Sequence, residues 1–186
     1  EREAEEQAGA AAAGGAAGGE WRFVPFAHAG SSVTLSQGGA VATKGGSGNN
    51  DTNAVAAADE SLSAGVHCWE VEITKGWNIS VGVCKADVRP ESGTKELFNQ
   101  QGKAWVMHAG GGTLWPGEKD AAGQVSEGAR LGCKLDLGAG TLTFYLNGVK
   151  HGPGWTGIVG PVKRCVEIEV EGDSVTLVRT EPAFRD

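Results

Sequence analysis

The chain has 186 residues, of which 31 are glycine and 6 are proline, and it carries a formal net charge of −7. A domain of this length buries about 70% of the surface of its unfolded chain, so its core is expected to need no metal or disulfide. The acidic balance, with no basic cluster beyond Lys163 and Arg164, argues against a nucleic-acid partner, and no apolar run is long enough to predict a membrane span.

Residues 1–19 are an acidic stretch followed by an Ala/Gly run. Alanine and glutamate favour helix, but the stretch has no apolar face with which to dock on a core. We therefore interpret it as a flexible tether and expect residues 20–186 to form the folded domain. The chain starts without Met, and we expect it to be one part of a longer protein.

Short runs of alternating apolar and polar residues, separated by glycine turns, predict strands through the rest of the chain. A helix is predicted only over residues 94–100. Many short strands without alternating helices indicate an all-β fold, a two-sheet antiparallel sandwich. The predicted strands cover residues 33–36, 40–43, 67–74, 78–84, 104–108, 113–115, 130–137, 141–147, 162–170 and 174–179.

The clearest hairpin signal lies in residues 131–148. Leu131, Cys133 and Leu135 alternate with small or polar residues, and the alternation resumes at residue 142 after a Gly-Ala-Gly turn. This pattern predicts an antiparallel hairpin with one solvated face. Asn147 and Gly148 then form the dipeptide best suited to a type I′ turn.

The cysteines and histidines do not form a motif typical of catalysis or metal binding. Cys68, Cys84, Cys133 and Cys165 lie in predicted strands without a CxxC pair, and we interpret them as buried residues of a protein in a reducing compartment. The four histidines lie in unrelated segments without a nucleophile motif. We predict a non-catalytic protein without a metal or other cofactor.

Two sets of carboxylates alternate along predicted strands. Glu70 and Glu72 project from one face, and Glu167, Glu169 and Glu171 repeat the pattern near the C-terminus. The simplest interpretation of both sets is a solvated strand face. For the second set an alternative stays open, an acidic stripe that attracts a basic peptide.

The tryptophans divide by position. Trp69, Trp77 and Trp105 lie in predicted strand segments and are expected in the core. Trp115 and Trp155 lie beside proline or glycine at loop margins, where an aromatic ring can anchor a ligand. Trp115 is the better candidate for such an anchor, although burial in the core remains an alternative for it.

Several sequence blocks together resemble the SPRY domain family. They are SSVTLSQGGAVAT from residue 31, HCWEVEI from residue 67, WNISVGVC from residue 77, LGCKLDLGAGTLTFYLNG from residue 131 and GIVGP from residue 157. The resemblance covers most of residues 33–178. It implies a bent β-sandwich that recognises proteins through loops at one end, here residues 44–53, 85–102 and 171–174. The best-known peptide-binding members have an aromatic residue before the glycine of the last turn, where this chain has Glu171, so their peptide motif is not carried over.

We expect the domain to have a loop surface that recognises a peptide or surface of another protein. Lysine and arginine side chains, including Arg164, are expected to donate hydrogen bonds, and Phe98 or Trp115 to supply an apolar anchor. We expect a monomeric domain inside a larger intracellular protein, in the cytoplasm or nucleus. The alternatives are a structural docking domain in a large assembly and a lectin-like sandwich. The predicted partner-binding residues are Lys44, Ser47, Asn49, Asn50, Asp51, Asp87, Arg89, Thr94, Lys95, Phe98, Trp115 and Glu171.

Overall fold

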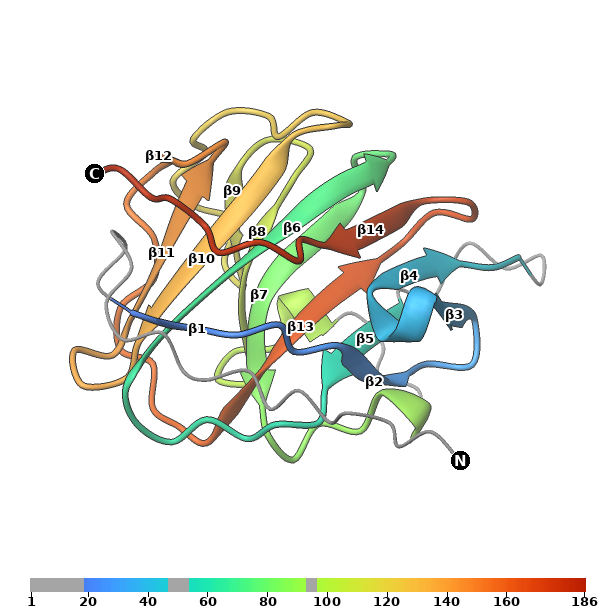
Figure 1. Cartoon of the computed structure of the whole chain (residues 1–186), viewed down its shortest axis with the longest axis horizontal. Coiled ribbons are helices and arrows are strands. Elements are labelled where there is room, and N and C mark those ends of the chain that lie inside the picture. Colours follow the sequence, from blue (N-terminus) through green and yellow to red (C-terminus); the bar gives the residue numbers. More distant parts are fainter. Residues whose placement is uncertain (1–18, 47–53, 93–96) are drawn as a thin grey trace, which may run out of the picture.

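Two β-sheets stack face to face in the computed structural model, which describes residues 19–46, 54–92 and 97–186 (Figure 1). The first sheet has the order β12-β11-β10-β6-β14-β4-β3, with β1 added beside β6, and the second has the order β2-β5-β13-β7-β8-β9. Neighbouring strands are antiparallel except for the short β1–β6 pair. In the described residues the strands are β1 (Glu20–Trp21), β2 (Phe26–Ala29), β3 (Val33–Ser36), β4 (Val41–Lys44), β5 (Ala54–Ala58), β6 (Val66–Lys75), β7 (Ile79–Lys85), β8 (Ala104–His108), β9 (Thr113–Trp115), β10 (Arg130–Asp136), β11 (Thr141–Leu146), β12 (Val149–Lys150), β13 (Val162–Ile168) and β14 (Ser174–Leu177).

The hairpin of β10 and β11 forms as its alternation predicts. Leu131 pairs with Leu146 at one end, and Asp136 pairs with Thr141 at the other. Asn147 and its following glycine have φ values of 48° and 86°, which carry the chain tightly into β12. The all-β sandwich expected from the sequence is therefore confirmed.

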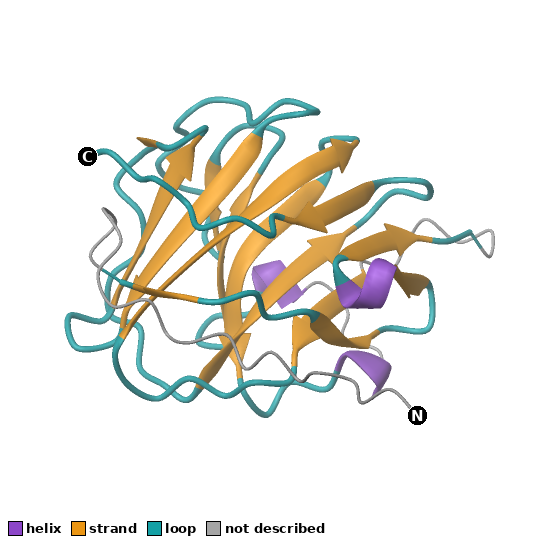
Figure 2. Ribbon diagram, in the orientation of Figure 1, coloured by secondary structure: helices purple, strands orange, loops and turns teal. Residues whose placement is uncertain are grey.

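The sequence pattern missed β1, β2, β5 and β12, and it predicted a helix that the described residues do not contain. Strand β5 reads AVAAA and is buried along its whole length, so it has no apolar–polar alternation to detect. Within the described residues, helical turns are confined to three short 3₁₀ segments (Figure 2). They are η1 (Gln37–Gly39), η2 (Pro90–Ser92) and η3 (Leu97–Asn99). The last of these is the described end of the predicted helix, and residues 93–96 lie outside the described chain.

The core between the sheets is apolar and includes buried thiols. Side chains such as Ile73, Phe144 and Ile168 fill the interior. All four cysteines are buried and free, as predicted for strand residues. Burial raises the pKa of Cys68 to about 11 and that of Cys133 still further, so both thiols are protonated at neutral pH.

The C-terminal segment covers the outer face of the first sheet. The ring of Phe184 stacks on Tyr145 with centroids 4.1 Å apart, and the Tyr145 hydroxyl donates to Asp186 over 2.7 Å. Beneath it, Glu70 is only 6% exposed, and burial raises the pKa of its carboxyl group despite Arg130 nearby. The prediction of a fully solvated face for Glu70 was wrong, because a segment distant in sequence lies over it.

Candidate partner-binding site

A hollow lies on the outer face of the second sheet, where β13, β7, β8 and β9 run side by side. Strand register places Glu167, Ser80, His108 and Thr113 in one row across these four strands. Side chains of one row on adjacent strands project from the same face of a sheet. Residues from four separate parts of the sequence therefore line one surface.

The described parts of the loop between β7 and β8, residues 86–92 and 97–102, pack on the outer face of the second sheet, and Phe98 forms one wall of the hollow. Leu97 and Val88 pack onto a second buried cluster that includes Val106 and Cys165. The Lys163 ammonium group donates to the carbonyl oxygen of Val88 over 2.6 Å, so the loop is hydrogen-bonded to β13. Lys163 itself is only 4% exposed, which makes this contact part of the interior.

Phe98 and Trp115 form an aromatic corner in this hollow. Their rings meet edge to face, with centroids 5.1 Å apart and an interplanar angle of 88°. The backbone N–H of Phe98 donates to a carboxylate oxygen of Glu167 over 3.0 Å, which fixes the loop wall against β13. Both aromatic residues are half-buried.

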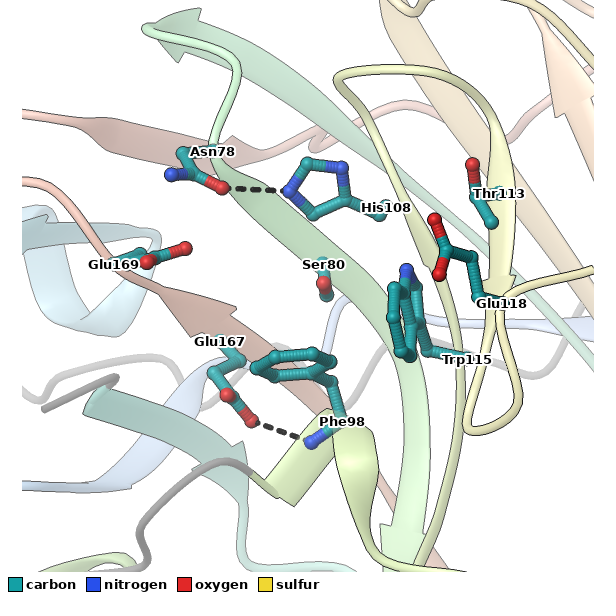
Figure 3. A pocket seen from close by; sticks show the side chains of 9 residues that line it. All are labelled: Asn78, Ser80, Phe98, His108, Thr113, Trp115, Glu118, Glu167 and Glu169. Carbon is teal, nitrogen blue, oxygen red and sulfur yellow. Dashed lines mark hydrogen bonds between the residues drawn. The ribbon is translucent and has the colours of Figure 1, made fainter. Parts of the chain in front are cut away.

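The hollow is a pocket of about 330 Å³ (Figure 3). Ser80 lies in its floor, Glu167 and Glu169 lie on one side, and Trp115 and Glu118 lie on the opposite side (Figure 3). Polar and aromatic groups therefore face each other across an open space. The lining residues are Asn78, Ser80, Phe98, His108, Thr113, Trp115, Glu118, Glu167 and Glu169.

His108 adds no positive charge to this pocket at neutral pH. Its Nε2 lies 2.7 Å from the side-chain oxygen of Asn78, and its Nδ1 accepts a hydrogen bond from the N–H of Gly110 over 3.2 Å. These contacts assign the proton to Nε2, which donates to Asn78. Burial lowers the pKa of His108, so the ring is neutral and both nitrogens are engaged.

The exposed ring of Trp77 stands beside the pocket. It meets His108 edge to face with centroids 6.2 Å apart, and 55% of the residue is exposed. The expectation that Trp77 belongs to the core was wrong, because it lies in the turn between β6 and β7. Trp69 is buried as expected, and Trp155 is also buried, with its indole N–H donating to the carbonyl oxygen of Val106.

Two of the predicted binding residues, Phe98 and Trp115, lie together in the pocket. Lys44 is only 4% exposed, and its backbone pairs with the turn before β14, beside the exposed Glu171. Asp87 and Arg89 are exposed on the loop of residues 85–102 but do not line the pocket. The predicted residues that lie outside the described chain are Ser47, Asn49, Asn50, Asp51, Thr94 and Lys95.

Two expectations about charged residues of β13 need correction. Glu167 is 3% exposed rather than solvated, because the loop wall packs over it. Arg164 is 4% exposed and lies on Trp69, so it is not an accessible donor. The sequence analysis did not identify Ser80, His108 and Thr113 as site residues, because only the register of neighbouring strands brings them together. The acidic stripe that the sequence left open comprised Glu167, Glu169 and Glu171, of which the first two line the pocket.

The family model for the SPRY domain matches residues 66–165, more than half of the chain. The chain belongs to the SPRY domain family. The SPRY fold is generally a non-catalytic module for protein interaction, and its β-sandwich is the architecture described above. No helix within the described residues is long and apolar enough to cross a membrane.

Solved structures confirm the SPRY fold over most of the chain. The SPRY domain of human HERC1 has a TM-score of 0.67 at 18% identity, with 82% of this chain and 95% of that chain covered. The TRIM65 PSpry domain gives 0.68 at 22% identity, with coverage of 86% and 90%. The stonustoxin structure gives 0.65 at 21% identity and covers 83% of this chain but only 27% of its own.

Proposed function

We propose that this SPRY domain is a non-catalytic recognition module that binds an exposed segment of a partner protein at the outer face of its second sheet. The observation that carries the proposal is the aromatic corner of Phe98 and Trp115, which opens into a polar pocket. Concave sites with aromatic walls and a few polar groups are typical of ligand binding. Large, partly exposed aromatic residues are also the usual anchors of protein interfaces.

The size of the pocket suits one large side chain rather than a whole cofactor or domain. A volume of about 330 Å³ lies at the lower end of small-ligand pockets. The exposed Trp77 and residues 97–102 of the loop before β8 offer further contact area around it. An extended segment that inserts one residue and rests its flanks on this rim would use all of these features.

The described parts of the site are held together by the protein's own contacts. Its floor is a sheet, and its loop wall is held by the hydrogen bonds of Lys163 and Glu167. A preformed surface lowers the entropy lost on binding. This rigidity supports recognition by a prearranged surface.

The polar chemistry of the pocket favours binding over catalysis. Ser80 and His108 are cross-strand neighbours, but both ring nitrogens of His108 are engaged by Asn78 and Gly110. The histidine is therefore badly placed to take a proton from the serine hydroxyl. We further propose an intracellular location, because four free, buried cysteines suit a reducing compartment.

A selection from a random peptide library displayed on phage tests this function. The full chain is used as bait, in parallel with Trp115→Ala, which opens the pocket, and Thr113→Tyr, which fills it. Lys150→Ala, on exposed β12 of the other sheet, is the matched control. We expect peptides that bind the wild type and the control but neither pocket variant, with each protein assayed well below its own melting temperature. Failure to enrich any peptide, or full binding by both pocket variants, would overturn the proposal.

A further inference from the structure

We infer that the pocket binds a positively charged side chain, lysine or arginine, of the partner segment. This inference rests on the proposed function and adds the chemistry of the residue that is inserted. Four observations on the described residues carry it: the charges around the pocket, an uncovered tryptophan ring, an unused hydroxyl group in the floor and the spread of the carboxylates.

The charged groups that the described residues place in the pocket wall have one sign. Glu118, Glu167 and Glu169 contribute carboxylates, and the described lining contains no lysine or arginine. Neither Glu118 nor Glu169 forms an ion pair with any described cation. With His108 neutral, the pocket attracts a cation and repels an acidic side chain.

Trp115 differs from three other tryptophans of the chain in its surroundings. Trp69, Trp105 and Trp155 each have a cation of this protein over the ring, at 4.9, 5.8 and 4.4 Å from the centroid. No described lysine or arginine lies over the ring of Trp115. Its indole, beside Phe98, therefore offers an unoccupied aromatic surface to a ligand cation and to the methylene groups behind it.

The floor of the pocket offers one hydrogen-bond acceptor. Ser80 is 3% exposed, and no described residue forms a hydrogen bond with its hydroxyl group. The hydroxyl oxygen of Ser80 lines the pocket, so a ligand N–H that reaches it forms a hydrogen bond that no described residue provides. Ammonium and guanidinium groups carry several such donors.

The arrangement of the carboxylates favours an organic cation over a metal ion. Glu118 lies across the pocket from Glu167 and Glu169 (Figure 3). The described residues contain no group of three His, Cys, Asp or Glu side chains that could hold a metal ion. Carboxylates spread around a pocket suit a side chain with several N–H donors better than a small ion that needs converging oxygens.

Titration with small probes tests the inference directly, by ¹⁵N–¹H NMR on the full chain. The probes are N-acetyl-arginine methylamide and N-acetyl-lysine methylamide, with the citrulline and norleucine analogues as neutral controls. We expect the charged probes to shift the Trp115 indole N–H saturably, with the signal assigned by its absence in Trp115→Phe. The neutral analogues should leave it unchanged.

Charge-neutralising variants make the same test sharper. Glu118→Gln/Glu169→Gln keeps the shape of the pocket and should weaken probe binding at least fivefold, as should added salt. Glu20→Gln/Glu181→Gln removes the same charge from exposed positions outside the pocket and should bind as the wild type does. Equal shifts with neutral probes, or unchanged binding by the pocket pair, would overturn the inference.

Peptides from the library selection separate this inference from the proposed function. We expect each to contain a basic residue whose replacement by citrulline or acetyl-lysine lowers affinity at least tenfold. If peptides require Trp115 for binding but tolerate neutralisation of every basic residue, the recognition function stands. The inference that the pocket binds a positively charged side chain is then refuted. If no peptide is enriched, the proposed function fails, and the NMR titration still decides whether the pocket binds cations.

Discussion

The guanidinium group of Arg164 lies 4.9 Å from the centre of the Trp69 ring, on the side of β13 that faces the other sheet. Burial lowers the pKa of Arg164 to about 10, an effect that the nearby Glu60 partly opposes. Its Nε is buried without a hydrogen-bond partner in the described residues, so this cation occupies the interior with incomplete compensation. Glu60 also pairs with Arg22 at the edge of the interior.

Replacement of this buried cation is therefore expected to be tolerated. Arg164→Met should leave the free energy of unfolding within about 1 kcal/mol of the wild type or raise it, because Arg164 forms no ion pair with a described residue and methionine removes the cost of burying its unsatisfied Nε. Trp69→Ala should lower it by about 3–5 kcal/mol, because it opens a large cavity. Urea unfolding followed by circular dichroism measures both, and a large loss for Arg164→Met alone would contradict this account.

His28 is expected to make stability depend on pH. It lies between Asp59 and Glu91, at 2.7 and 2.6 Å, and ties β2 to η2. Hydrogen bonds to Asp59 and then Glu91 raise the pKa of His28 in the folded protein. The stability that protonated His28 contributes is therefore complete below its pKa in the unfolded chain, and it is lost as pH rises through its pKa in the folded protein. The pKa values of Asp59 and Glu91 are lowered in the folded protein, so the stability that these two carboxylates contribute is lost as pH falls through the lowered pKa values.

The difference in melting temperature between wild type and His28→Gln should therefore be largest near about pH 5.5 and smaller at about pH 8. Glutamine keeps a polar side chain at this position and does not titrate. Thermal unfolding of both proteins across this range is the measurement. A difference that does not change with pH would refute the proposed ion pairs.

Gly132 should tolerate no side chain while the C-terminal segment is in place. A Cβ at this position would overlap the ring of Phe184. Gly132→Ala is expected to cost about 1–3 kcal/mol of stability, in the range of overpacked sites. In a double-mutant cycle with Phe184→Leu, the cost should shrink, and additive effects would exclude the steric explanation.

The thiols are expected to be unreactive in the folded protein. All four are buried, and burial raises the pKa of Cys68 and Cys133. Labelling by Ellman's reagent should be slow in native buffer and rapid after unfolding in guanidinium chloride. One thiol that reacts quickly without denaturant would identify a region that opens locally.

The sequence predicts the parts of this fold in which one strand face is apolar and the other is not. The hairpin of β10 and β11 and most central strands have that pattern, whereas β5, buried along its whole length, does not. Glu70 and Glu167 were expected in solvent because nothing in their own strands indicates that a distant segment covers them. Phe98 and Trp115 were identified as candidates, but their assembly with Ser80 and His108 depends on strand register and on the packing of η3, which the sequence pattern does not reveal.

The side chains that line the pocket come from both strands and a connecting loop. Strands supply Ser80, His108 and Glu167, whose positions are fixed by the ladder of the sheet, whereas Phe98 comes from a connecting loop. Substitutions or insertions in that loop can reshape the aromatic wall without altering the sandwich. Changes in the loop can therefore alter which ligands such a domain prefers, while the polar groups contributed by the sheet keep their positions. A graft of this loop between homologous domains would carry shape selectivity but leave charge selectivity with the recipient.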